Sequence, residues 1–250
     1  MKQNLIVYFL VSIFCFLLSC DSESANECVK KSGNIVKREL QDLPTFNKIR
    51  VEEGVELILF QDSQQKIEIE AGENLINDVS VQVVDGELIV KNNISCNWFR
   101  SYTPAKAYVT FTEINRIYSV SQHKIHSAQT LNFDHIELSS GVHNEAITSE
   151  FIMTINCSDL NINANDATYF NLSGNANSMF VAFWGGEPRI DAPNLKANSI
   201  EVFQRSSNDM VLHPLDEIKG NIYSTGNIVL KNNPISIDIT QHYTGKLIID

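Results

Sequence analysis

The stretch SDLNINANDATYFNLSG, residues 158–174, shows the pattern that decides the fold. Leu160 and Ile162 occupy alternate positions after a small polar residue, and Phe170 and Leu172 do the same before a Ser-Gly pair. A period of two in apolar residues is typical of strands with one buried face. Asn and Gly suit tight corners because they accept positive φ at little cost. The stretch therefore predicts short β-strands separated by corners.

Such corners recur from about residue 117 to the C-terminus, roughly 12 to 20 residues apart, which is near the length of one β-helix coil. We expect them at Ser121, Ser140-Gly141, Ser158, Ser173-Gly174, Gly185-Gly186, Ser206 and Thr225-Gly226. A single coil cannot bury its own apolar side, whereas stacked coils share one core. The pattern predicts an all-β protein with a right-handed β-helix-like solenoid of short strands. An ordinary β-sandwich, whose strands also recur between turn signals, is the alternative.

The first half of the chain predicts a region that contains a β-hairpin. Residues 66–70 and 80–83 alternate apolar and polar side chains, and Glu87 to Val90 continue the pattern. Between two such runs lies Asp85-Gly86, a pair that tolerates the positive φ values of a type I′ turn. With the solenoid, this region makes one domain over residues 44–250.

The N-terminus carries an export signal. Lys2 precedes an apolar run over residues 5–18, and Leu17-Leu18-Ser19-Cys20 resembles a bacterial lipobox. The run is about 14 residues, short of the ~20 that a membrane-spanning helix needs. We expect a signal peptide over residues 1–19, lipidation of Cys20 and a lipidated tether over residues 20–43. The protein would then be an outer-membrane lipoprotein, on the periplasmic or the cell-surface face, and would contact the membrane through its lipid.

The net charge is -11, and removal of Lys2 with the signal makes it about one unit more negative. An acidic chain without a basic cluster has no electrostatic footprint for nucleic acid, so we expect no nucleic-acid partner. Three cysteines remain beside Cys20 in the mature chain. Cys157 has the parity of an inward residue and is expected as a buried thiol. Cys28 and Cys96 lie in polar, irregular segments and are expected to form a disulfide, with three free thiols as the alternative.

Several segments in a fixed order resemble a known family. They are residues 43–49, 54–59, 73–76, 83–88, 96–102, 190–195 and 226–228 with Asn233-Pro234. The chain is similar over most of residues 43–250 to the head-GIN domain family of auto-transporter adhesins, which is common among Bacteroidetes lipoproteins. This resemblance implies a right-handed β-helix-like fold on the cell envelope and defines no catalytic residues. The family is rich in Ser-Gly pairs, which this chain replaces at Ser121-Gln122 and Arg205-Ser206-Ser207.

Two aromatic sites are candidates for ligand binding. Trp98, Arg100 and Tyr102 follow Cys96 closely. Aromatic faces stack on pyranose rings, and Arg binds hydroxyls or carboxylates, so these residues could form a sugar platform. The alternative is a plug that covers one end of the solenoid, since terminal coils need a cap. Trp184, followed by two glycines, is the second candidate, with core packing as its alternative.

A group of charged residues raises a rival function. Glu187, Arg189 and Asp191 share one strand parity, and Arg205 lies about one coil further on. Paired carboxylates can cleave glycosidic bonds, so a β-helix polysaccharide lyase or hydrolase is the rival. A solvated row of charges is the preferred interpretation, because the sequence contains no Asn-Thr-Asp, Asp-Asp or Gly-His-Gly segment of the kind that polygalacturonases show. It also contains no nucleophile elbow, phosphate loop or dinucleotide fingerprint. We expect no enzyme activity and no cofactor.

Four histidines crowd one region, but we expect no metal site. A closed ligand set would need several of them on one face, and residues three apart on a strand point to opposite faces. The four are His123, His126, His135 and His143, and we expect them on the surface.

These features favour an envelope-anchored, adhesin-like module for binding or scaffolding, which presents a polar, Asn-rich solenoid surface to a glycan or a surface protein. A purely structural lipoprotein is a third possibility. The sequence leaves the oligomeric state open.

Overall fold

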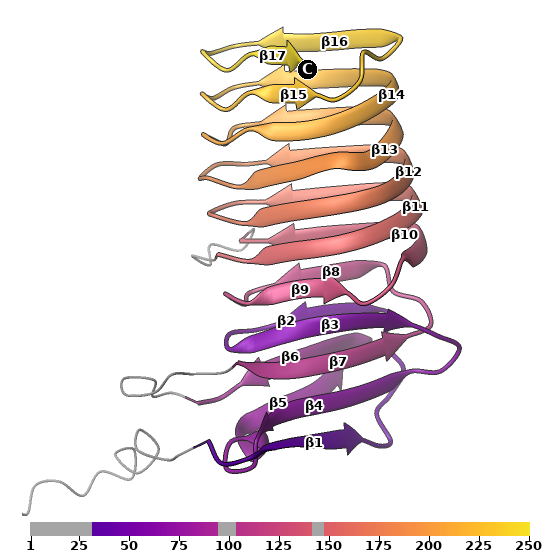
Figure 1. Cartoon of the computed structure of the whole chain (residues 1–250), viewed down its shortest axis with the longest axis vertical. Coiled ribbons are helices and arrows are strands. Elements are labelled where there is room, and N and C mark those ends of the chain that lie inside the picture. The colour runs from indigo at the N-terminus through magenta and orange to yellow at the C-terminus, as the bar shows by residue number, and fades with distance from the viewer. Residues whose placement is uncertain (1–31, 95–103, 142–147) are drawn as a thin grey trace, which may run out of the picture.

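The computed structural model describes residues 32–94, 104–141 and 148–250 (Figure 1). Nearly all regular structure in these ranges is β, with one 3-10 helix, η1 (Ile76–Asp78), and no helix long and apolar enough to cross a bilayer. The strands are β1 (Ile35–Leu40), β2 (Lys48–Val51), β3 (Val55–Gln61), β4 (Lys66–Gly72), β5 (Val79–Val84), β6 (Glu87–Asn92), β7 (Ala105–Phe111), β8 (Arg116–Ser119), β9 (Lys124–Ser127), β10 (Leu131–Ser140), β11 (Glu150–Ala164), β12 (Tyr169–Phe183), β13 (Arg189–Gln204), β14 (Met210–Ile222), β15 (Ile228–Leu230), β16 (Ser236–Gln241) and β17 (Leu247–Ile249).

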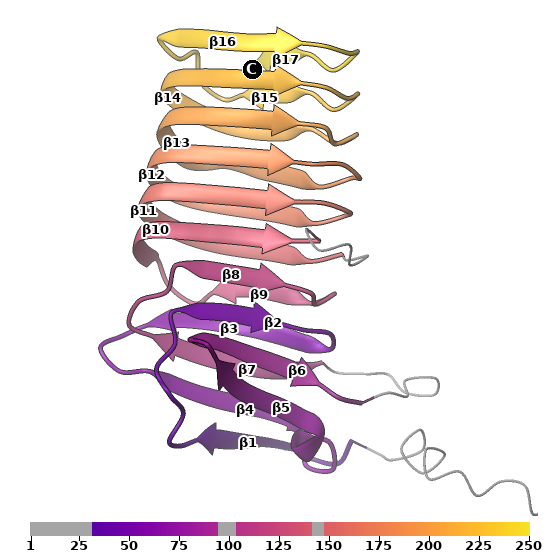
Figure 2. The ribbon, with the colours of Figure 1, turned by 180° about the vertical axis from the view of Figure 1, so that it is seen from behind.

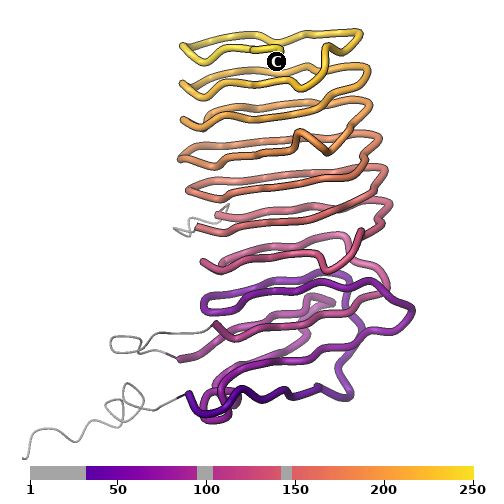
Figure 3. The backbone as a smooth tube through the Cα atoms, viewed as in Figure 1, coloured from indigo at the N-terminus to yellow at the C-terminus, as the bar shows by residue number. Residues whose placement is uncertain are grey.

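The second half of the chain is a β-solenoid of about six turns, which confirms the predicted fold class (Figure 3). Neighbouring coils pair in parallel, β11 with β12 and β12 with β13 along almost their whole length. In Figure 1 the chain runs to the right in front, returns to the left behind and climbs, which is a right-handed course. Parallel pairing of successive coils rules out the antiparallel β-sandwich.

The register gives the true length of a coil. One inward column passes through Phe151, Phe170, Ile190, Met210, Ile228 and Leu247, with steps of 19, 20, 20, 18 and 19 residues by subtraction. Ser173 and Gly174 lie inside β12, which keeps its hydrogen bonds as it passes round one end of the coil. The last coil is interrupted at the aligned positions, between β15 and β16. Gly174 has a φ of 115° there, and a glycine suits this close approach of two main chains.

Two corners, at Ser121-Gln122 and at Arg205-Ser206-Ser207, lack the Ser-Gly pair that is typical of the family, and the coils remain regular at both. The hydroxyl of Ser121 donates to the Val55 carbonyl at 2.6 Å and accepts from the amide of His123. Ser206 makes the same pair of bonds further along the solenoid: its hydroxyl donates to the Pro188 carbonyl and accepts from the amide of Asn208. A buried serine thus satisfies the main chain at these corners without a glycine.

The N-terminal strands form a curled sheet that begins the solenoid (Figure 2). The predicted hairpin is confirmed, since β5 and β6 pair antiparallel across Asp85 and Gly86, which both have positive φ. The expected boundary at residue 44 needs correction: β1, within the segment expected to be tether, pairs antiparallel with β4. Alternation of half-buried and exposed residues along β1 explains why it joins the sheet.

A continuous apolar interior runs through sheet and solenoid, as stacking of coils requires. Phe151 and Phe170 stack with ring centroids 4.9 Å apart, and Phe170 and Phe183 lie 6.3 Å apart. All three are fully buried. Cys157 is half-buried and packs against this core, where burial raises the pKa of its thiol to about 11. The thiol is therefore a packing group instead of a nucleophile.

Candidate functional site

The structure places an exposed row of aromatic rings along one edge of the last coils. We call Trp184, Phe203, Tyr223 and His242 the aromatic ladder. Ring centroids are 4.8 Å apart from Trp184 to Phe203, 5.0 Å from Phe203 to Tyr223 and 4.3 Å from Tyr223 to His242. The last pair is nearly parallel, with 7° between the ring planes. Trp184 and Tyr223 keep 46% and 40% of their surface exposed. Because the rings lie against one another, the ladder presents mainly ring edges to solvent.

Main-chain pairing holds the ladder in place. The amides of Trp184, Tyr223 and His242 donate to the coil below them, to the carbonyls of Ala164, Gln204 and Ile222. These residues therefore occupy one register position, where β12, β14 and β16 end. Phe203, within β13, fills the space between Trp184 and Tyr223. A rigid scaffold fixes the rings before any ligand arrives, which lowers the entropic cost of binding.

Polar groups flank the rings. The Trp184 indole N–H donates to Asn163 Oδ1 at 3.3 Å, and His242 Nε2 lies 2.8 Å from Asn221 Oδ1. Arg205 is exposed and occupies the register position between Trp184 and Tyr223, because its amide donates to the Phe183 carbonyl. Apolar ring edges beside amide and guanidinium groups suit a ligand that has both C–H groups and hydroxyls.

The candidate residues Arg189 and Asp191 pair with each other at the start of β13, away from the aromatic ladder. Arg189 donates to both carboxylate oxygens of Asp191, at 2.8 and 3.1 Å, and the Tyr169 hydroxyl donates to Oδ2 at 2.9 Å. Burial and this bond to Asp191 raise the pKa of the Tyr169 phenol. Both oxygens of Asp191 are thus engaged within the protein.

Arg205 and Glu187 do not join that unit. The register aligns Asp191 with Asn171 and Val211, whereas Arg205 lies at the corner with the ladder. Within the described residues no ion pair links Arg205 to Asp191 or Glu187. The structure therefore assigns Trp184 and Arg205 to one surface, and Arg189 and Asp191 to another.

Asparagine side chains form a second regular surface. Asn156 donates to Asn132 at 3.3 Å, and Asn175 donates to Asn156 at 3.1 Å, across three successive coils. These columns belong to the Asn-rich surface that the sequence predicts. Within each column, the side-chain amide of one Asn hydrogen-bonds the side-chain amide of the next. Ser178 and Asp159 pair in the same manner on neighbouring coils.

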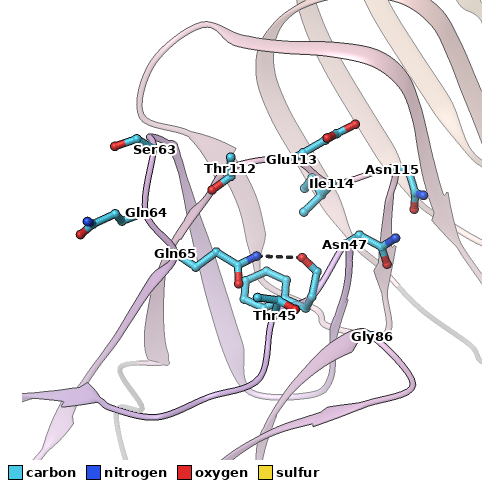
Figure 4. A pocket seen from close by; sticks show the side chains of 11 residues that line it. Thr45, Asn47, Ser63, Gln64, Gln65, Gly86, Thr112, Glu113, Ile114 and Asn115 are labelled. Carbon is cyan, nitrogen blue, oxygen red and sulfur yellow. Dashed lines mark hydrogen bonds between the residues drawn. The ribbon is translucent and has the colours of Figure 1, made fainter.

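Two polar hollows lie away from the ladder. The larger, about 800 Å³, is surrounded in Figure 4 by side chains from residues 45–47, 63–65 and 112–115. Gln65 donates to the Phe46 carbonyl at 2.8 Å at its base. The second hollow, about 470 Å³, lies over β10 to β14, where Lys219 pairs with Glu201 at 3.3 Å. Most of the residues that line the two hollows are polar, although Phe46 and Ile114 add apolar surface to the larger one.

The remaining predicted sites divide into two groups. Trp98, Arg100 and Tyr102, the lipidation site Cys20, the cysteines Cys28 and Cys96, and His143 lie outside the described residues. His123 and His126 are half-buried instead of freely exposed, and burial lowers the pKa of His123. Among described residues, no group of three or more His, Cys, Asp or Glu side chains could hold a metal ion.

The ladder partners of Trp184 were missed from the sequence, although a signal was present. Trp184, Phe203, Tyr223 and His242 are 19, 20 and 19 residues apart, which is the length of one coil. Aromatic residues at this spacing indicate rings stacked along the solenoid, once the coil length is known.

Residues 45–234 match the family described as "Putative auto-transporter adhesin, head GIN domain". Solved structures share the fold. A "putative adhesin" from Bacteroides fragilis has a TM-score of 0.77 at 20% identity, over 87% of this chain and 97% of that one. A "putative adhesin" from Parabacteroides merdae has a TM-score of 0.66 at 16% identity, over 89% and 98%. A "putative lipid binding protein" from Parabacteroides distasonis has a TM-score of 0.62 at 14% identity, over 86% and 97%. No curated protein matches the sequence.

Proposed function

The chain belongs to the family described as "Putative auto-transporter adhesin, head GIN domain", and we propose that it is an envelope-anchored lipoprotein that binds glycans. The aromatic ladder is the observation that carries the proposal. Trp184, Tyr223 and His242 are exposed and Phe203 is half-buried between them; main-chain pairing fixes the rings, and Asn163, Asn221 and Arg205 flank them. Adhesin descriptions of the family and of its structural relatives support an adhesin-like role.

Glycan chemistry matches this arrangement better than a folded protein surface does. A sugar ring offers apolar C–H groups and equatorial hydroxyls, and the ladder offers apolar ring edges beside the amide groups of Asn163 and Asn221. The spacing of about 5 Å between rings repeats along the solenoid, so an extended oligosaccharide could contact several rings. We propose the ladder as the contact surface and the Asn columns as its hydrated surround.

We expect Trp184→Ala and Tyr223→Ala each to weaken glycan binding about tenfold or more, because truncation of a central aromatic contact costs roughly 2 kcal/mol. The measurement is binding of residues 21–250 to an array of neutral and acidic glycans, followed by titration with the best oligosaccharide. Phe180→Ala, on the half-buried aromatic of the smaller hollow, is the control and should bind normally. Unchanged binding by both ladder variants, or loss only in the control, would contradict the proposed site.

The rival enzyme function has no observation in its favour. Glycosidase chemistry needs a carboxylate that is free to act on the substrate, and both oxygens of Asp191 accept hydrogen bonds from Arg189 or Tyr169. The same glycan incubation tests the point: new reducing ends or unsaturated products that vanish in Asp191→Asn would establish turnover.

The proposed lipid anchor rests on the N-terminal sequence, where Leu17-Leu18-Ser19-Cys20 resembles a lipobox. We expect Cys20→Ser to move the protein from the membrane fraction to the soluble fraction of the envelope, because two or more acyl chains on Cys20 are needed for stable anchoring. Cys28→Ser is the matched control and should stay with the membrane. Equal membrane retention of both variants would refute the anchor. The Cys28–Cys96 disulfide stays a prediction, which non-reducing electrophoresis can test.

A further inference from the structure

The last coil leaves one edge of the solenoid without a strand partner among the described residues. β16 pairs with β14 and β17 pairs with β15, both on the side toward the earlier coils (Figures 1 and 2). The amides of His242 and Asp250 donate downward, to the carbonyls of Ile222 and Leu230. Successive residues of a strand direct their N–H and C=O groups to opposite sides. Ile237, Ile239 and Ile249 therefore direct their N–H and C=O groups away from the solenoid. The edge is thus a template for another strand.

The apolar interior opens at the same end. Ile237 and Ile249 continue the inward columns of Ile218 and Leu230, which are fully buried, but they remain 38% and 51% exposed. Five of the nine large hydrophobic residues that are exposed in the described part of the chain lie on this coil: Ile235, Ile237, Tyr243, Ile248 and Ile249. The exposed apolar end of a solenoid core needs a capping element or a partner that shields it from water.

The opposite end of the molecule is built differently. Its edge strand, β1, carries Lys37, Arg38 and Glu39, and its side chains form ion pairs with β4, such as Lys37–Glu68 at 2.7 Å. Charged residues on an edge strand hinder further pairing. β16, with the sequence SIDITQ, has Asp238 as its one charged residue, and that side chain has outward parity. The two ends therefore differ in their readiness to accept a strand.

We propose that two copies of this chain associate end to end through their last coils. The charge distribution favours this occupant: the chain carries -11, yet residues 228–250 contain two Lys and two Asp, a net charge of zero by subtraction. Two copies can therefore meet at this end with little of the repulsion that their other surfaces would cause. A two-fold axis perpendicular to the solenoid brings each β16 edge against its own copy in the antiparallel sense. Such an interface is isologous, and it closes both core mouths at once.

Sedimentation equilibrium of residues 21–250, which retain every described residue, tests the proposal. We expect a monomer–dimer equilibrium in the micromolar range or tighter, and we expect Ile237→Lys to raise the dissociation constant at least about tenfold, since it places a charge at a buried apolar contact. Ile249→Lys, on the other strand of the coil, should act in the same direction.

Ile35→Lys is the matched control, because Ile35 is 58% exposed on β1 at the far end. It should leave the dimer unchanged, and circular dichroism should show that all three variants fold. A wild-type protein that is monomeric up to its solubility limit would overturn the proposal. So would a dimer that Ile35→Lys disrupts and Ile237→Lys does not. Neither result depends on glycan binding, so the proposed function is tested separately.

Discussion

Phe170→Ala is expected to lower the free energy of unfolding by about 3–5 kcal/mol, the range for removal of a fully buried Phe side chain. Phe170 is fully buried, stacks on Phe151 of the coil below and lies 6.3 Å from Phe183, which belongs to the same strand, β12. Its removal opens a cavity between two coils, and the neighbouring coils cannot collapse into it, because main-chain hydrogen bonds on both sides fix their separation. Urea denaturation, followed by circular dichroism, measures the change.

Two controls make the Phe170 result specific. Phe170→Leu keeps most of the volume and should cost less than about 1.5 kcal/mol. Phe180→Ala removes a ring of the same size from the half-buried outer face and should also cost clearly less. Equal losses for Phe170→Ala and Phe180→Ala would mean that the stacked rings are not the core of the solenoid.

The solenoid could be predicted because one physical constraint repeats in every coil. Alternation such as Leu160-x-Ile162 fixes which side chains face inward, and stacking is the arrangement that buries them. The exact coil length could not be predicted from small polar residues alone. Ser158 and Gly174 both lie where the chain passes round one end of a coil, in β11 and β12, whereas Gly185 and Gly186 lie at the other end, between β12 and β13. Small residues serve bends, corners and close approaches alike, so their positions do not define a period.

The proposed binding surface is harder to predict than the fold for the same reason. Trp184 was identified because an aromatic residue beside two glycines is conspicuous. Phe203 and Tyr223 became its neighbours only through the register between β12, β13 and β14. Arg205 was expected beside Asp191, about one coil away, but an error of a few residues in coil length moves a side chain from a strand to a corner. Contacts between coils therefore demand a register that local patterns do not supply.

β1 shows a further limit of local patterns. Its sequence, IVKREL, has charged residues at three positions, and a polar segment between a signal and Pro44 is typical of a tether. Pairing with β4 nevertheless places Val36 and Leu40 against the core, while Lys37 pairs with Glu68. The partner strand lies some thirty residues away, so the strand is stabilised by a contact that the segment itself does not reveal.

Gly174→Ala is expected to lower the free energy of unfolding by about 3 kcal/mol or more, because two costs add. The φ of 115° is a conformation that residues with a Cβ rarely adopt. A Cβ at this position would also lie 1.9 Å from the Ile155 carbonyl oxygen of the neighbouring strand. Since that oxygen belongs to the main chain of β11, relief of the contact requires the two coils to separate.

Gly86→Ala separates these two costs. Gly86 also has a positive φ, 74°, but the nearest atom to a Cβ there is Asn47 Oδ1 at 3.4 Å, an ordinary contact. The decrease in the free energy of unfolding of Gly86→Ala should reflect backbone strain alone, about 1 kcal/mol. Gly220, with a φ of 135° and a Cβ position 2.0 Å from the Val202 carbonyl oxygen, should behave like Gly174. If Gly86→Ala lowers the denaturation midpoint as much as Gly174→Ala and Gly220→Ala do, close approach between coils is not the reason for glycine at positions 174 and 220.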